Sequence, residues 1–305
     1  MGPKVFGVLF IIVAIGVALY ILRFDIFGGL KQLNVWLPSA SYRGPSLPAQ
    51  PTQPGYEYQA PATESNSTPQ PQSGAQPTVN PSEIPSGFTI NQLSPYFHKV
   101  RLGSVSAGSS WYVGRISLYA SFSDSGTVDI TGWLLKGNKG SQFIPSAVNL
   151  YDPSGLTSEG DILLKSGGVV NIYTSESTIG RNLRLNKCLG YLENSNKFTP
   201  QLPMNCPYID RSEISSFTGA CQDYIASLGS CRVPTANPPL PENDYACRAY
   251  LDTLNYRGCF NKHLGDTDFL SNEWWAWTGS RFLDERHDVL LLFDKNGLLV
   301  DRYEY

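Results

Sequence analysis

The clearest pattern in this chain is the alternation of apolar and polar residues in its C-terminal two thirds. Over Ile116–Phe122 every second residue is apolar, and the residues between them are serine and tyrosine. A period of two predicts a β-strand that buries one face. Similar short runs predict further strands over Val128–Leu135, Val169–Tyr173, Val289–Phe293 and Leu298–Tyr303.

Turn signals separate these strands. The last two flank Asp294-Lys295-Asn296-Gly297, and Asn-Gly between two apolar runs predicts a hairpin because both residues tolerate positive φ. No alternation of strands with long helices is present, so a parallel sheet with crossover helices is not expected. The sequence therefore predicts a mainly β, antiparallel β-sandwich.

The N-terminus has a different pattern. Val5–Leu22 is an apolar run without charge, led by Lys4 and closed by Arg23. Such a run is long enough for one transmembrane helix. We predict that residues 1–27 form a retained anchor, because the small residues needed for signal-peptide cleavage lie only inside the run. A cleaved signal peptide is the alternative.

Residues 28–94 are rich in proline, glutamine, serine and threonine and poor in apolar side chains. Such a segment cannot bury enough surface to offset its ordering entropy, so we predict a disordered linker. It would act as a stalk that carries residues 95–305 away from the membrane.

Two stretches resemble the central and final strands of lamin tail domains. They are Ile130–Leu135 with the later Phe143–Pro145, and Asp288–Tyr305 at the C-terminus. The resemblance covers about Pro95–Tyr173 and Trp274–Tyr305. It implies an immunoglobulin-like sandwich that serves as a binding or structural module. Bacterial members of the family often occur in exported or membrane-anchored proteins, sometimes beside hydrolase domains.

A cysteine-rich insert, predicted over residues 185–273, interrupts this domain. All six cysteines lie between Cys188 and Cys259, and an even, clustered set favours disulfides in an oxidising compartment. We therefore expect the N-terminus in the cytoplasm and the C-terminal domain on the extracytoplasmic side, at the cell surface.

Two stretches of the insert share the pattern Cys-x-x-Tyr-aliphatic-x-x-Leu followed by a second cysteine. Each predicts a short helix with a cysteine at either end, about 15 Å apart, which is too far for a bridge within one helix. An antiparallel helical hairpin would pair Cys221–Cys259 and Cys231–Cys247, and would leave Cys188–Cys206. Six cysteines allow many other pairings. Zinc is a weaker alternative, because there is no Cys-x-x-Cys and His263 stands alone beside the cysteines.

The densest aromatic cluster is Trp274, Trp275 and Trp277, with Phe282 nearby. One interpretation is a ligand-binding platform for a sugar or a protein partner. The other, which we favour, is packing where the insert rejoins the sandwich. Trp133 is predicted to lie in the core.

A charged run precedes the last hairpin. Asp284, Glu285 and His287 are the residues from which a hydrolase's acid–base site would be built. We favour a solvated loop, because side chains at adjacent positions do not converge on one substrate atom.

Composition narrows the function further. The formal net charge is −3 without a clustered basic excess, so no nucleic-acid partner is expected. No nucleotide-binding or metalloprotease motif is present, and we predict no catalytic residue, cofactor or metal. The sequence favours a non-catalytic binding or structural module of a bacterial cell envelope, with a protein or glycan partner and possible self-association. An envelope-polymer hydrolase and a subunit of a surface layer or filament are the alternatives.

Overall fold

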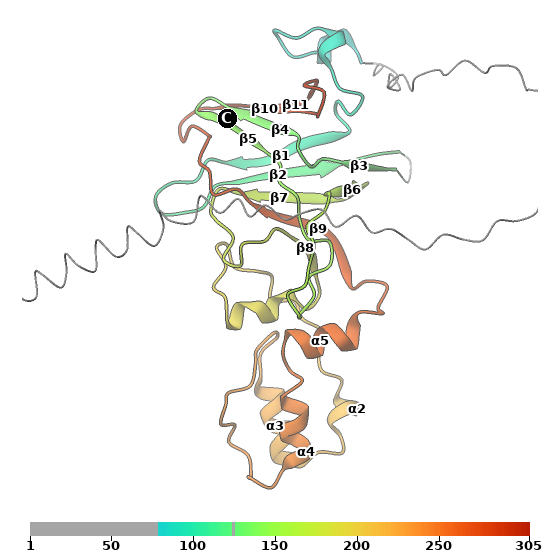
Figure 1. Cartoon of the computed structure of the whole chain (residues 1–305), viewed down its shortest axis with the longest axis vertical. Helices are drawn as coiled ribbons and strands as arrows, with labels where there is room; N and C mark the ends of the chain where they lie inside the picture. The colour runs from blue at the N-terminus through green and yellow to red at the C-terminus, as the bar shows by residue number, and fades with distance from the viewer. Residues whose placement is uncertain (1–78, 124–125) are drawn as a thin grey trace, which may run out of the picture. The chain divides into compact units, whose positions relative to one another are not determined.

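Two β-sheets enclose the main hydrophobic core (Figure 1). The computed structural model describes residues 79–123 and 126–305, and these residues are mainly β. The first sheet has the spatial strand order β1-β2-β7-β9-β8. Its strands are β1 (Val100–Ser106), β2 (Arg115–Ala120), β7 (Val169–Tyr173), β9 (Leu270–Trp277) and β8 (Leu183–Asn186).

The second sheet has the order β11-β10-β4-β5, and a short third sheet pairs β3 with β6. These strands are β11 (Leu299–Glu304), β10 (Val289–Phe293), β4 (Leu134–Gly137), β5 (Gly140–Phe143), β3 (Thr127–Asp129) and β6 (Leu163–Lys165). Buried side chains of the first two sheets meet in one cluster, with Leu118 and Ile172 from one sheet and Leu135 and Leu292 from the other. The predicted β-rich, sandwich-like fold is confirmed.

The alternation in β2 has the predicted effect. Ile116 and Leu118 are buried in the main core, whereas Tyr119 on the other face is 44% exposed. Ser117 also lies on that other face but is buried, and its hydroxyl donates to Asn171 Oδ1 in β7 at 2.6 Å. The polar partner explains how a serine is accommodated there.

The predicted strand Val128–Leu135 is wrong as one element, because the chain turns in its middle. Gly132 has a φ of +76°, and Trp133 N–H donates to the Ile130 carbonyl at 3.1 Å. The first half becomes β3 and the second becomes β4, in different sheets. Trp133 lies in the main core at 2% exposure, as predicted.

The predicted C-terminal hairpin is confirmed, since β10 and β11 pair antiparallel. Its turn depends on the Asp294 carboxylate, whose Oδ1 accepts from Asn296 N–H and Leu298 N–H. Oδ2 accepts from the Ser94 hydroxyl at 2.7 Å. Gly297 alone in this turn has positive φ, at +74°.

Strand β9 corrects the expectation of a purely antiparallel sheet. It pairs parallel with β7, from Val169 opposite Glu273 to Tyr173 opposite Trp277, and antiparallel with β8. A parallel neighbour requires a long connection. Here the connection comprises β8 and the whole cysteine-rich insert.

The packed part of the chain begins before residue 95. Two 3₁₀ helices, Pro81–Glu83 and Ile90–Gln92, precede β1. Phe88 and Phe97 belong to a small cluster with Leu299 of β11. The predicted anchor (1–27) and most of the predicted linker (28–94) lie outside the described residues. Within residues 79–123 and 126–305, no helix is long and apolar enough to cross a membrane.

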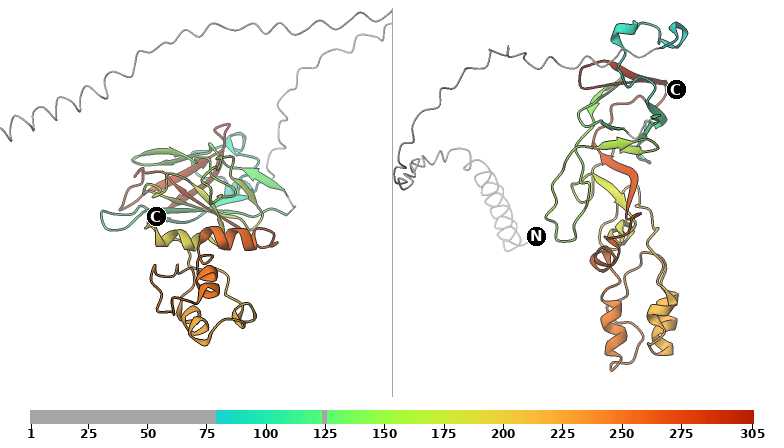
Figure 2. Two further views of the ribbon diagram at one scale, coloured as in Figure 1. Left: turned by 60° about the horizontal axis from the view of Figure 1, so that its bottom comes forward. Right: turned by 90° about the vertical axis from the view of Figure 1, so that its right-hand side faces the viewer.

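The insert joins β8 to β9 and contains the helices of this region. They are a 3₁₀ helix at Leu189–Asn194, α2 (Arg211–Ile214), α3 (Gly219–Ser227), α4 (Tyr245–Leu251) and α5 (Tyr256–His263). Helix α5 lies against the first sheet (Figure 2), where Tyr256 and Phe260 share a core cluster with Tyr173, Trp275 and Trp277. Helices α3 and α4 have a separate small core that contains Ile225 and Leu251.

All six cysteines form disulfides, but the predicted pairing is wrong. The bridges are Cys188–Cys259, Cys206–Cys231 and Cys221–Cys247. Cys221 and Cys247 lie in the first turns of α3 and α4, so this bridge joins the N-terminal ends of the two helices. An antiparallel hairpin would instead place the first turn of one helix beside the last turn of the other.

The caps of α3 and α4 also hold the N-terminal ends of the two helices together. Thr218 caps α3 and Asp244 caps α4, each by accepting the N–H of the cysteine in the first turn. The Thr218 hydroxyl also donates to Asp244 Oδ2 at 2.7 Å, so the two caps contact each other.

Candidate functional site

The three clustered tryptophans are buried and do not form an exposed platform. Trp274, Trp275 and Trp277 are 3%, 6% and 6% exposed. Trp274 faces the main core, while Trp275 and Trp277 face the cluster shared with α5. Trp277 Nε1–H donates to the Thr199 carbonyl at 3.2 Å. Trp275 and Trp277 therefore pack between the insert and the sandwich, whereas Trp274 packs inside the sandwich.

The charged run before the last hairpin is a structured loop. Asp284 Oδ1 accepts from Arg286 N–H, and Oδ2 lies 3.3 Å from Lys139 Nζ. The hydrogen bond from the Arg286 backbone N–H has the larger effect and the contact with Lys139 the smaller one. Together they hold the pKa of Asp284 below its usual range. His287 Nδ1 lies 2.6 Å from the Tyr305 carbonyl oxygen, and Glu285 is exposed. The three residues thus have different surroundings and do not converge on one point.

A groove in the insert is a better candidate for a functional site. A hollow of about 500 Å³ lies beside α2 and α3, and a second of about 120 Å³ lies beside α4 and α5. We call the two together the insert groove. The hollows share the following lining residues: Tyr191, Pro207, Tyr208, Ile209 and Leu254.

The fold of the insert fixes the walls of the larger hollow. Its apolar floor includes Ile214, Ile225 and Leu254, which belong to the core of α3 and α4. The disulfide Cys206–Cys231 joins two parts of its rim, since Pro207–Ile209 follows Cys206 and Arg232 follows Cys231. A buried disulfide therefore cross-links two parts of the rim.

Tyr208 is the aromatic side chain most available at this groove. It is 94% exposed, although it lines both hollows. Exposed aromatic side chains at the edge of a concave site are typical of binding surfaces, because they bury much area at a small entropy cost.

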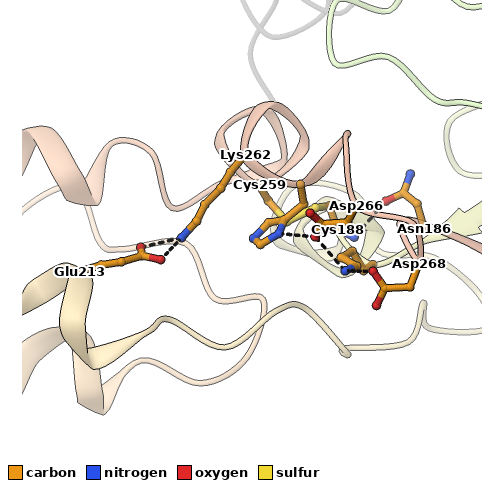
Figure 3. A network of polar contacts seen from close by, with 9 residues as sticks. Asn186, Cys188, Glu213, Cys259, Lys262, Asp266 and Asp268 are labelled. Atoms are coloured by element: carbon orange, nitrogen blue, oxygen red, sulfur yellow. Dashed lines mark hydrogen bonds and ion pairs between the residues drawn. A yellow bond between two sulfur atoms is a disulfide. The ribbon is translucent and has the colours of Figure 1, made fainter.

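The charged groups of the smaller hollow are paired within the chain (Figure 3). Lys262 Nζ contacts both carboxylate oxygens of Glu213. The Tyr250 hydroxyl donates to Glu213 Oε2 at 3.3 Å. Burial, together with this carboxylate, raises the pKa of Tyr250 to about 12. Glu213 and Lys262 in this hollow are thus already paired with each other.

A second set of ion pairs lies at the C-terminal end of α5. His263 Nδ1 lies 2.8 Å from Asp266 Oδ2, and Lys187 Nζ binds both Asp266 and Asp268 (Figure 3). The hydrogen bond from Lys187, and then that of His263, holds the pKa of Asp266 below its usual range. Lys187 follows β8 and Asp266 precedes β9, so these ion pairs close the base of the insert.

The charged side chains of the larger hollow are not paired in this way. The side chains of Arg211, Asp223 and Arg232 line it, and all three are exposed. Within residues 79–123 and 126–305, the side chain of none of the three forms a hydrogen bond or an ion pair. They therefore remain available to a ligand, and the exposed ring of Tyr208 lies at the same site.

These residues were not identified from the sequence. Tyr208 and Arg211 lie in a stretch between cysteines that has no hydrophobic period, and Arg232 directly follows a cysteine. Their common site depends on the Cys206–Cys231 bridge, which was not among the predicted pairs. The only signal available was an aromatic and two arginines close to cysteines.

One group has the composition of a metal site but not its chemistry. Ligand atoms of Cys221, Asp244 and Cys247 lie within 4.8 Å of one another. The two sulfurs form a disulfide and therefore cannot act as thiolate ligands, while Asp244 caps α4. The arrangement is a structural cross-link.

Comparison with known proteins gives no relative: no family model, no curated protein and no solved structure matches this chain.

Proposed function

We propose that this protein is a non-catalytic binding module of the cell envelope, anchored by its N-terminal helix and exposed outside the cytoplasm. In this proposal a lamin-tail-like, immunoglobulin-like sandwich supports the insert, and the insert groove holds the ligand. One observation carries the proposal. The larger hollow combines a 94% exposed tyrosine with three charged side chains that have no partner among the described residues.

The disulfides support an extracytoplasmic position. Three bridges in a domain of this size favour an oxidising compartment, because cytoplasmic thiols are kept reduced. The uncharged run Val5–Leu22 supports a membrane anchor, and the proline-rich residues after it suit a spacer. The sandwich would then face the envelope with its insert.

The positions of the acidic and histidine side chains support a binding role over hydrolysis. Asp284 and His287 are held by Lys139 and by the C-terminal carbonyl, and His263 is held by Asp266. A general acid–base pair has to face a common substrate atom. In the described residues these groups serve to fix loops instead.

Retention on isolated envelopes tests the proposal. The full chain, labelled with a fluorophore, is mixed with envelope fragments from the cells that express it, and bound protein is sedimented. We expect Tyr208→Ala to lower retention about tenfold, because it removes the most exposed aromatic contact. The matched control is Tyr245→Ala, which removes another exposed tyrosine of the insert, 76% exposed and outside the groove.

Two results would contradict the proposal. The first is equal retention of the native chain and Tyr208→Ala, which would remove the groove from the function. The second is release of soluble fragments from the envelopes by the native chain, since that would indicate an enzyme.

A further inference from the structure

The chemistry of the larger hollow allows a more specific statement about its ligand, which rests on the binding role proposed above. The geometry points to an acidic glycan as the ligand of this hollow. Arg211 and Arg232 would bind its acid groups, Asp223 would accept its hydroxyls, and the ring of Tyr208 would stack on a sugar.

The charged side chains of the larger hollow that lack partners favour an anionic ligand. Two of the three are guanidinium groups, which form paired hydrogen bonds with carboxylate or sulfate more effectively than any other side chain. Arg211 begins α2, and Arg232 follows the last bridged cysteine of the rim. They therefore reach the hollow from separate segments, so each would bind a different acid group of the ligand.

Asp223 adds the second requirement for a sugar. It lies on α3, exposed and on the wall of the same hollow. A carboxylate in the same hollow as two guanidinium groups would disfavour a ligand that carries only negative charge. It is well suited to a ligand that also offers hydroxyl donors, because an ionised carboxylate only accepts hydrogen bonds.

Size and shape agree with a short glycan segment. A hollow of about 500 Å³ lies within the range of sites that take small ligands. A globular protein partner would instead need a contact area of roughly 800 Å² on each side, which is usually flat. The exposed ring of Tyr208 at the rim provides an apolar face for stacking, and its cross-linked backbone limits the entropy lost on binding.

Calorimetry with matched ligands tests the inference. The full chain in mild detergent is titrated with short oligosaccharides of three kinds: carboxylated, sulfated and neutral, together with the methyl esters of the carboxylated set. The ester keeps the size and the hydroxyls of its parent but removes the charge. We expect at least one acidic member to bind about tenfold more tightly than its neutral counterpart, and high salt to reduce this difference.

Variants locate the binding. We expect Arg211→Gln, Arg232→Gln and Tyr208→Ala each to weaken the acidic ligand about tenfold. Arg286→Gln is the matched control, because Arg286 is an exposed arginine outside the groove. All variants change exposed side chains, and an unchanged melting temperature would show that the fold is kept.

The outcomes separate the two proposals. If Tyr208→Ala abolishes envelope retention but no acidic oligosaccharide binds better than its neutral counterpart, the acidic-glycan inference is overturned and the binding role stands. If retention survives removal of glycans by periodate but is lost after protease treatment of the envelopes, the partner is a protein, and the inference is again overturned. If retention does not depend on Tyr208, the proposed function itself fails.

Discussion

A single buried carboxylate organises the loop before the last hairpin. Asp288 is 0% exposed, and its Oδ1 and Oδ2 accept from Asn138 N–H at 2.8 Å and Asp284 N–H at 2.6 Å. We expect Asp288→Ala to lower the free energy of unfolding by about 3 kcal/mol, because two N–H groups lose a charged acceptor. Urea unfolding of the full chain measures this loss.

The neighbouring acid provides the control. Glu285 is exposed, and we expect Glu285→Ala to change the same free energy by less than about 0.5 kcal/mol. A similar loss for both variants would mean that the general charge of the loop, and not the buried acceptor, stabilises it.

At the residue scale the sequence predicts what depends on hydrophobicity alone. The burial of Trp133 could be predicted, because an apolar side chain beside a β pattern belongs in a core. The sequence could not show that Asp288, and not Asp284, is the buried acceptor. Residue type alone does not indicate which backbone N–H groups a carboxylate will bind in the fold. The same limit applies to Arg211 and Arg232, because the sequence does not show that their side chains lack partners among the described residues.

At the scale of elements, helix caps determine on which helix each cysteine lies. The second cysteine stretch has the same pattern as the first, yet it contains two helices, because Asn255 caps α5 by accepting Gly258 N–H. Cys247 and Cys259 therefore lie on different helices, which the shared pattern concealed. Asn255 after a leucine was the signal for this break.

The bridges differ in how much they stabilise the chain. Cys188–Cys259 spans 71 residues, whereas Cys221–Cys247 spans 26. Loop-closure entropy then predicts losses of about 4.5 and about 3.5 kcal/mol when each pair is replaced by alanine. Urea unfolding under non-reducing conditions compares the two variants. Equal losses, or a larger loss for the shorter loop, would show that packing around the sulfurs outweighs the entropy of the unfolded chain.

At the scale of the whole molecule, the insert covers part of the sandwich. Its ends are adjacent, since Lys187 N–H donates to the Phe269 carbonyl at 3.1 Å. Replacing residues 188–268 by Asn-Gly should therefore leave a tight hairpin between β8 and β9. The variant would uncover Tyr173, Trp275 and Trp277, which pack against Phe198 and α5 in the native chain.

We expect this deletion variant to unfold cooperatively but to bind the dye ANS more strongly than the native chain, because a large apolar patch becomes exposed. Fluorescence titration and urea unfolding measure the two properties. Additional Trp275→Thr and Trp277→Thr substitutions should reverse much of the dye binding. A deletion variant that has no cooperative transition would show instead that the sandwich depends on the insert for its stability.

Most of the sandwich could be predicted from short-range patterns, whereas the arrangement across the insert could not. Strands such as β7 and β10 were predicted with the bounds that the structure has, because each contains its own hydrophobic period. The position of β9 between β7 and β8 has no local signal, since pairing partners far apart in the sequence are chosen by the whole fold. The insert groove was missed for the same reason.

The central position of β9 also sets the order in which the first sheet can form during synthesis. β7 and β8 are complete long before β9 emerges, and until then each presents an unpaired edge. Val170 in β7 pairs with Trp274 in β9, and all six cysteines lie between these two residues in the sequence. Because open strand edges promote aggregation, oxidation of the insert and closure of the sheet belong to one late step. Slow oxidation of the insert would therefore leave the edges of β7 and β8 exposed for longer.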